Sequence, residues 1–175
     1  TPTHTLSLHD ALPIYLITSR GQAALNGVYK LVAVRGDGEW IPALKVSESP
    51  AKTLNPGYKR VWRVYGNDGQ ATADLVALHD EQPGDAAELL LRHPSDPGMK
   101  RRLKREDIAE LEPLLVDVFQ QGEGVCEPPS IEAMRRQRSA DLDRLDDGVR
   151  RIINPHVYHV SLTQRLWELK QQLID

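Results

Sequence analysis

Two alternating segments on either side of a short polar turn constrain the fold of this 175-residue chain more than any other feature. Residues 58–65 and 71–79 both alternate in side-chain character with a period of two, and residues 66–69 between them read Gly-Asn-Asp-Gly. A period of two places successive side chains on opposite faces of a strand, and these turn residues suit a tight connection. The pattern predicts an antiparallel hairpin, in which Asp74 pairs with Arg63 or caps a turn rather than acting in catalysis.

Several other stretches predict short strands. A β-forming run over 27–34 is followed by the turn Gly36-Asp37-Gly38 and a second run over 41–47, which together indicate a further hairpin. Apolar runs at 88–92 and 114–119 also predict strands, whereas residues 107–112 favour one helical turn before a proline. We therefore expect a sheet of five or six strands, mostly antiparallel.

The period changes towards the C-terminus, where helices are expected. Ser130 follows two prolines and is a good helix N-cap, and apolar residues at 131, 134, 142 and 145 form one stripe. Ser161 to Gln164 matches a capping box, and leucines at 162, 166, 169 and 173 have helical spacing. The last helix should therefore dock on the sheet. These patterns together predict an α+β fold, a mostly antiparallel sheet with C-terminal helices.

Composition restricts the class of protein without indicating a function. The net charge of −3 gives no general attraction to nucleic acid or membrane, and no apolar run approaches the roughly 20 residues of a membrane span. A single cysteine, Cys126, excludes an internal disulfide and fits a reducing compartment, so we expect a cytoplasmic protein. The sequence has no phosphate-binding Walker loop, zinc spacing or dinucleotide fingerprint. The adjacent His79 and Asp80 lack a third ligand nearby, and no metal site is predicted.

Residues 1–14, TPTHTLSLHDALPI, stand apart from the rest of the chain. They resemble the translation of a synthetic sequencing adapter fused to an end of the protein. We interpret them as an adapter-derived artefact, expected to be disordered, and we exclude them from fold and site predictions.

Six segments of the remaining sequence carry a resemblance to a known family. In order they read GVYKLVAV, PALKVSESPAK, NPGYKRVWRVYGNDG, ADLVALHDE, PPSIEAMRRQR and NPHVYHVSLTQRLWELKQQLI. Their order and spacing resemble the C-terminal part of bacterial nicotinate phosphoribosyltransferase from about Leu16 to Ile174. The resemblance implies the tail of a type II phosphoribosyltransferase, an incomplete α/β barrel edge plus a C-terminal domain. Residues 15–57 would be the last part of the barrel region and a linker, and residues 58–175 the C-terminal domain.

The resemblance also implies a function for the intact protein. Such an enzyme couples ATP hydrolysis to the formation of nicotinate mononucleotide from nicotinate and phosphoribosyl pyrophosphate in NAD biosynthesis, with Mg²⁺ at the pyrophosphate. It is expected to be a homodimer. Its catalytic residues would lie upstream of this chain, so no catalytic residue is assigned to this sequence. We expect the fragment alone to be inactive, with no ATP or Mg²⁺ site of its own.

Lys30 is the one candidate site residue. It is the only charged residue in the run 27–34, and periodicity alone fits an outward-facing lysine on a half-buried strand. The family resemblance implies that a lysine near this position contacts phosphate groups of the substrate, for which an ammonium is a suitable partner.

Two alternatives to an enzyme fragment stay open. The chain could be a non-catalytic structural or interaction module. It could also bind nucleic acid through the five basic residues between Lys100 and Arg105. No aromatic residue lies in that cluster for base stacking, so a solvated or subunit-facing strand is favoured, with neither nucleic acid nor membrane as a partner.

Overall fold

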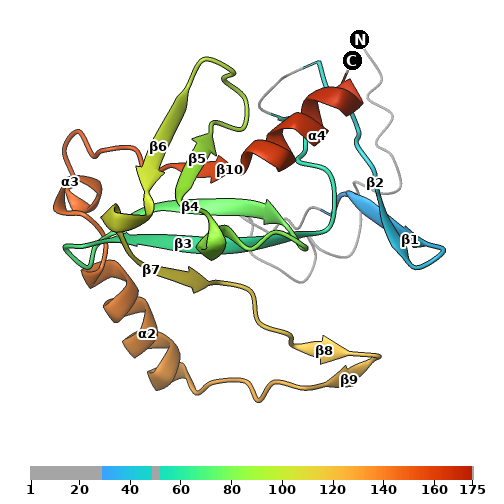
Figure 1. Ribbon diagram of the computed structural model, residues 1–175. Coiled ribbons are helices and arrows are strands. Elements are labelled where there is room, and N and C mark those ends of the chain that lie inside the picture. The colour runs from blue at the N-terminus through green and yellow to red at the C-terminus, as the bar shows by residue number, and fades with distance from the viewer. Residues whose placement is uncertain (1–28, 49–51, 175) are drawn as a thin grey trace, which may run out of the picture. The chain divides into compact units, whose positions relative to one another are not determined.

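The computed structural model describes residues 29–48 and 52–174 (Figure 1). The chain divides into two compact units, Thr1–Lys30 and Leu31–Asp175. All the described helices and strands lie in the second unit. The strands are β1 (Ala33–Gly36), β2 (Glu39–Pro42), β3 (Lys59–Gly66), β4 (Ala71–Leu78), β5 (Glu88–Arg92), β6 (Lys100–Lys104), β7 (Ile108–Pro113), β8 (Phe119–Gln120), β9 (Glu123–Gly124) and β10 (Val160–Leu162). The α-helices are α2 (Ile131–Asp143), α3 (Asp147–Arg150) and α4 (Gln164–Ile174), and short 3₁₀ turns span Pro83–Asp85 and Arg105–Asp107.

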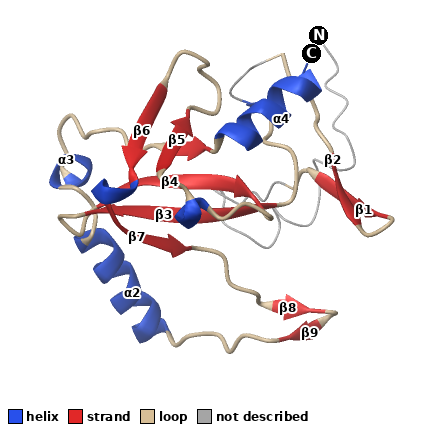
Figure 2. Cartoon of the chain, in the orientation of Figure 1, coloured by secondary structure: helices blue, strands red, loops and turns tan. Residues whose placement is uncertain are grey.

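Six strands form one sheet in the order β6-β5-β10-β4-β3-β7. All neighbouring pairs run antiparallel except β10 and β4, which are parallel. Strand β10 comes late in the chain, yet it lies between β4 and β5 in the middle of the sheet. The prediction of a mostly antiparallel sheet with C-terminal helices, an α+β fold, is confirmed (Figure 2).

The hairpin predicted around residues 66–69 is confirmed as β3 and β4. Its register places Arg63 opposite Asp74, and β3 continues the sheet by pairing with β7 on its other side. Gly69 has a φ of 77°, a left-handed conformation that favours glycine, and the Asp68 carboxylate accepts a hydrogen bond from the Gln70 amide. The polar turn residues therefore close the hairpin as the sequence indicates.

The six-stranded sheet is curled. Its two edge strands, β6 and β7, are joined only by the 3₁₀ turn Arg105–Asp107. In a flat sheet these edges would lie five strand spacings apart, roughly 24 Å, whereas a 3₁₀ turn advances only about 2 Å per residue. The curl gathers side chains from both edges into one apolar core, which comprises Val64, Ala73, Leu75, Leu89, Leu91, Leu103 and Ile108.

The last helix covers the opposite face of the sheet. Leu166 of α4 is fully buried against Leu78 of β4 and Leu162 of β10, and Trp167 and Leu169 pack beside them. The prediction that this helix docks on the sheet is confirmed, but the predicted capping box is wrong. Ser161 lies inside β10, and the hydroxyl of Thr163 instead accepts a hydrogen bond from the Leu166 amide.

The region between β7 and α2 differs most from the sequence prediction. Residues 107–112 do not form a helical turn, because most of them form edge strand β7 along β3. The run 114–119 is not a strand except at Phe119, which begins the small hairpin of β8 and β9. Ser130 does cap α2, accepting a hydrogen bond from the Ala133 amide, yet none of the side chains of α2 is buried within the described chain.

The first hairpin is shorter than predicted. Residues 27 and 28 lie outside the described residues, and the first strand begins only at Ala33. The second strand, β2, ends at Pro42, although the Ala43 amide still donates a hydrogen bond to the Val32 carbonyl. The turn itself is as expected, with Asp37 and Gly38 at positive φ values of 49° and 86°.

Candidate functional site

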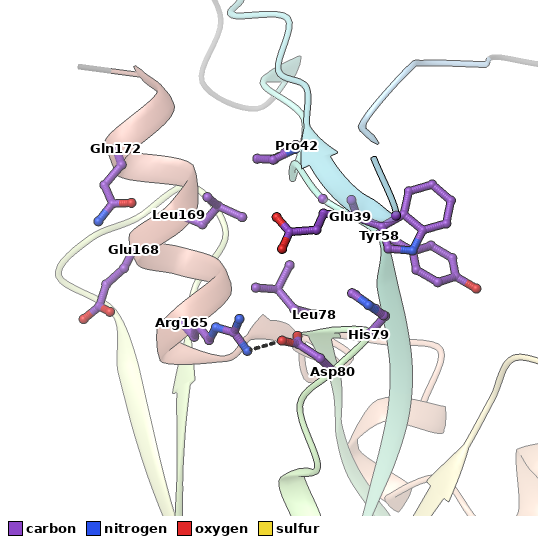
Figure 3. Close-up of a pocket in the computed structure, with 13 residues that line it drawn as sticks. Glu39, Pro42, Tyr58, Leu78, His79, Asp80, Arg165, Glu168, Leu169 and Gln172 are labelled. Atoms are coloured by element: carbon purple, nitrogen blue, oxygen red, sulfur yellow. Dashed lines mark ion pairs between the residues drawn. The ribbon is translucent and has the colours of Figure 1, made fainter. Parts of the chain in front are cut away.

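A cavity of about 590 Å³ lies beside the open end of the β3–β4 hairpin (Figure 3). Four separate stretches of the chain line it, at residues 38–42, 57–58, 78–80 and 165–172. They belong to the β1–β2 hairpin, the residues just before β3, the end of β4 with the residues that follow it, and helix α4. The cavity therefore forms only when the two ends of the second unit come together.

Backbone contacts fix the strand ends at this cavity. The His79 amide donates to the Tyr58 carbonyl at 2.9 Å, and the Gly57 amide donates to the Val32 carbonyl at 2.7 Å. Gly57 is buried with a φ of 87°, and a Cβ atom at this position would lie 2.7 Å from Cδ2 of Leu78. Only glycine fits at this position, since a side chain would meet both a strained backbone and a steric clash.

An aromatic cluster forms one wall of the cavity. The ring centroids of Trp40 and Tyr58 are 4.5 Å apart, and those of Tyr58 and His79 are 5.1 Å apart. The Arg35 guanidinium carbon lies 5.8 Å from the centroid of the Trp40 ring, within the range of a cation–π contact. Residues from the β1–β2 hairpin and from the open end of the β3–β4 hairpin thus meet in a single aromatic cluster.

The charged groups at the cavity are mainly acidic. Asp80 forms an ion pair with Arg165 at 2.8 Å. Burial opposes the charged form of Asp80, but the hydrogen bond and charge of Arg165 outweigh it and hold the pKa of the carboxyl below its ordinary value. Glu39 and Glu168 add two further carboxylates. Three acidic groups and one guanidinium, with histidine left out of the count, give the lining a formal charge of −2.

These residues suit binding rather than covalent chemistry. No Ser, Thr, Cys or Lys is among the described residues that line the cavity, so no side chain of those nucleophilic types faces it. The adjacent His79 and Asp80 are engaged by Tyr58 and Arg165. The part of the chain that the structure describes contains no group of three or more His, Cys, Asp or Glu side chains able to hold a metal ion.

A second cavity, of about 750 Å³, lies between the β3–β4 turn, β6 and the chain before β10. It brings Arg101 and Arg102 of the predicted basic cluster together with His156 and His159. Both histidines are exposed. The basic cluster forms edge strand β6, as the solvated-strand interpretation requires, and nucleic-acid binding stays untested.

A partly buried network of polar side chains joins the segment before β10 to the sheet. The Tyr158 hydroxyl donates to Oδ1 of Asp74 at 2.8 Å, and Arg63 donates to both carboxylate oxygens of Asp74. Burial and the hydrogen bond to Asp74 raise the pKa of Tyr158. The predicted Arg63–Asp74 pairing is confirmed, whereas no pattern in the sequence indicated a contact from Tyr158.

Two lysines converge on Asn55 without a carboxylate partner among the described residues. Lys59 donates to the carbonyls of Asn55 and Gly57, and burial lowers its pKa to about 8. Lys170, only 3% exposed, donates to Oδ1 of Asn55 and to the Pro94 carbonyl, and burial also lowers its pKa. Both ammonium groups thus hold the loop that leads into β3.

Lys30, the predicted phosphate contact, belongs to the first unit. It is exposed and lies outside any helix or strand. The structure does not test its contact with phosphate, which stays a prediction. The predicted artefact at residues 1–14 lies outside the described residues.

Comparisons with known proteins agree on one family. The model of the nicotinate phosphoribosyltransferase C-terminal domain matches residues 58–170. Nicotinate phosphoribosyltransferase from Bacillus subtilis is 32% identical over 91% of this chain, and the Homo sapiens protein of the same name is 37% identical over 90%. The chain spans only 32% and 28% of the lengths of these two relatives.

A solved structure supports the same assignment. The crystal structure of human nicotinic acid phosphoribosyltransferase matches with a TM-score of 0.60 and 30% identity, over 70% of this chain and 24% of that one. The resemblance stated from the six sequence segments is therefore confirmed in both sequence and fold. The chain belongs to the nicotinate phosphoribosyltransferase C-terminal domain family.

Proposed function

We propose that this chain is the C-terminal part of an enzyme that makes nicotinate mononucleotide for NAD biosynthesis. In this reaction the ring nitrogen of nicotinate bonds to the ribosyl carbon of phosphoribosyl pyrophosphate, and pyrophosphate leaves. The observation that carries the proposal is the match of about 90% of the chain to relatives named nicotinate phosphoribosyltransferase.

ATP and Mg²⁺ belong to this proposal as requirements of the intact enzyme. ATP hydrolysis would drive the synthesis, and Mg²⁺ would neutralise the charge of the pyrophosphate group. The described residues contain no group of three or more His, Cys, Asp or Glu side chains that could hold a metal ion. As the family resemblance implies, we propose that ATP and Mg²⁺ bind in the part of the enzyme upstream of this chain, and we assign no catalytic step to the described residues.

The role that we propose for this chain is to complete the fold and the subunit contacts of a cytoplasmic homodimer. Support comes from the segment 114–134, which we call the arm. Its strands β8 and β9 contain two residues each, too few for a hairpin that is stable alone. Val116 and Phe119 are 72% and 71% exposed, and Ile131 is 63% exposed. Apolar surface of this kind is typical of a protein interface.

No helix in the described residues is both long and apolar enough to cross a bilayer.

A chimera tests the proposed function directly. Residues 58–174 replace the matching C-terminal segment of the Bacillus subtilis relative, and nicotinate mononucleotide formation is measured with nicotinate and phosphoribosyl pyrophosphate, with and without ATP. We expect the truncated relative to be inactive and the chimera to form product. The matched control is a chimera with Leu166→Asp, which disrupts a fully buried contact of α4 and should remove activity.

Two results would contradict the proposal. One is a chimera that is folded by circular dichroism but forms no product, which would favour the non-catalytic interaction module. The other is nicotinate-dependent ATP turnover by the purified 175-residue chain, since the catalytic residues would then lie within it.

A further inference from the structure

We propose that the 590 Å³ cavity beside α4 is a binding site for an organic cation with an apolar body. The inference does not depend on the proposed enzymatic function. It rests on the shape of the cavity, its apolar floor and the charges around its mouth.

The size and the floor of the cavity suit a small molecule. A volume of about 590 Å³ falls in the range of roughly 300–1,000 Å³ that is usual for ligand sites. Pro42 of β2, Leu78 of β4 and Leu169 of α4 point into the same space (Figure 3). Leu78 is also part of the apolar cluster under α4, so this floor is held in place by the core. An apolar ligand body would therefore bury its surface against a preformed floor.

The charge around the cavity selects a cation. Glu39 points into the space between β2 and α4, and it has no cationic partner among the described residues (Figure 3). The only guanidinium among the described residues that line the cavity, Arg165, is already paired with Asp80. Glu39 is exposed, so a bound cation would replace water beside its carboxylate, whereas an anion would meet a formal charge of −2.

The same charge disfavours the substrates of the proposed reaction as occupants. Nicotinate carries a carboxylate and phosphoribosyl pyrophosphate carries several phosphate charges, so both would be repelled by Glu39, Asp80 and Glu168. The negative charge of the cavity lining therefore favours a positively charged ligand.

Three probes of one shape test the inference on the purified 175-residue chain. Benzamidine is cationic, benzamide neutral and benzoate anionic, and their binding is followed by the shift of the Trp40 indole N–H signal in two-dimensional NMR. A Trp40→Phe variant assigns that signal among the three tryptophans. We expect benzamidine to bind at least about 10-fold more tightly than benzoate, with benzamide between them.

Variants locate the binding. Glu39→Gln should weaken benzamidine binding by about 3-fold, the effect of losing one partly exposed ion pair, and should leave benzamide binding unchanged. Glu132→Gln makes the same change of charge on α2, outside the cavity, and should have no effect. The inference is overturned if benzoate binds as tightly as benzamidine, or if Glu39→Gln and Glu132→Gln behave alike in chains that remain folded by circular dichroism.

Discussion

Arg63 on β3 and Asp74 on β4 lie directly opposite each other, and their side chains form a two-point ion pair with distances of 2.9 and 3.1 Å. The Tyr158 hydroxyl adds a third hydrogen bond to the same carboxylate. Both members of the pair are largely shielded from solvent, at 21% and 13% exposed. This network joins the central hairpin to the chain that leads into β10.

Loss of one member of this pair should destabilise the fold. Arg63→Ala leaves the half-buried Asp74 carboxylate without its main partner. We therefore expect the free energy of unfolding, measured with urea, to fall by about 2 kcal/mol. The matched control is Arg102→Ala, which breaks an ion pair with Glu88 whose partners are 66% and 43% exposed, and which should cost less than about 1 kcal/mol. Equal effects of the two variants would show that the Asp74 network is no stronger than a surface pair.

Gly57→Ala should be more harmful than Gly69→Ala. Both glycines have positive φ values, 87° and 77°, so each substitution strains the backbone by about 1 kcal/mol. At Gly57 the new Cβ atom also meets Leu78 at 2.7 Å, whereas Gly69 has no atom within 4 Å of that position. We expect a total loss of about 3 kcal/mol at Gly57, measured from the urea midpoints. A Gly57→Ala variant as stable as Gly69→Ala would contradict the close packing at the cavity.

Lys59 should make stability rise with pH between about 8 and 9.5. Burial lowers its pKa in the folded state from 10.5 to about 8, so in this range the unfolded chain binds more protons than the folded chain. The free energy of unfolding therefore increases with pH as the cost of burying the charge disappears. Lys59→Met should reduce this rise and leave the contribution of Lys170, whose pKa is also lowered by burial, whereas the exposed Lys52→Met should not change the rise. The range stops at about 9.5 because tyrosines titrate above it. Parallel slopes for wild type and Lys59→Met would exclude a shifted pKa at Lys59.

Thr163 rather than Ser161 should control the start of α4. The Thr163 hydroxyl accepts from the Leu166 amide and donates to Glu81, so Thr163→Ala removes a helix cap and a side-chain contact. We expect a loss of about 1–2 kcal/mol in urea unfolding. Ser161 lies in β10, is 7% exposed and makes no capping bond in the described chain, so Ser161→Ala should cost less stability than Thr163→Ala. A larger loss of stability for Ser161→Ala than for Thr163→Ala would instead support the capping box predicted from the sequence.

The sequence predicts those elements whose signals are local. The β3–β4 hairpin follows from its alternation and turn, and the Arg63–Asp74 pairing follows from the register. The start of α4 is misplaced by two residues because Ser161 and Thr163 are both good caps, and only the pairing of β10 with β4 decides between them. Strand β7 is not predicted because its apolar and polar side chains alternate only weakly. Its extended conformation is set by pairing with the edge of β3.

The candidate site could not be predicted from the sequence, because its residues do not form a recognisable sequence motif. Its aromatic wall joins Trp40, Tyr58 and His79, which come from three different strand ends. The ion pair of Asp80 with Arg165 joins β4 to the last helix. Lys170 did carry a signal, since it follows the buried Leu166 by four residues and must share its face of α4.

The position of β10 in the middle of the sheet has a consequence for biosynthesis. A ribosome synthesises β4 and β5 long before it reaches Val160–Leu162, which form β10. This strand lies between β4 and β5 and pairs with each of them. Until then the nascent chain carries two unpaired strand edges, each a template for pairing with the wrong partner. Closure of the sheet therefore waits for a late stage of translation, and chains that stop short of β10 are the ones that chaperones and proteases must recognise.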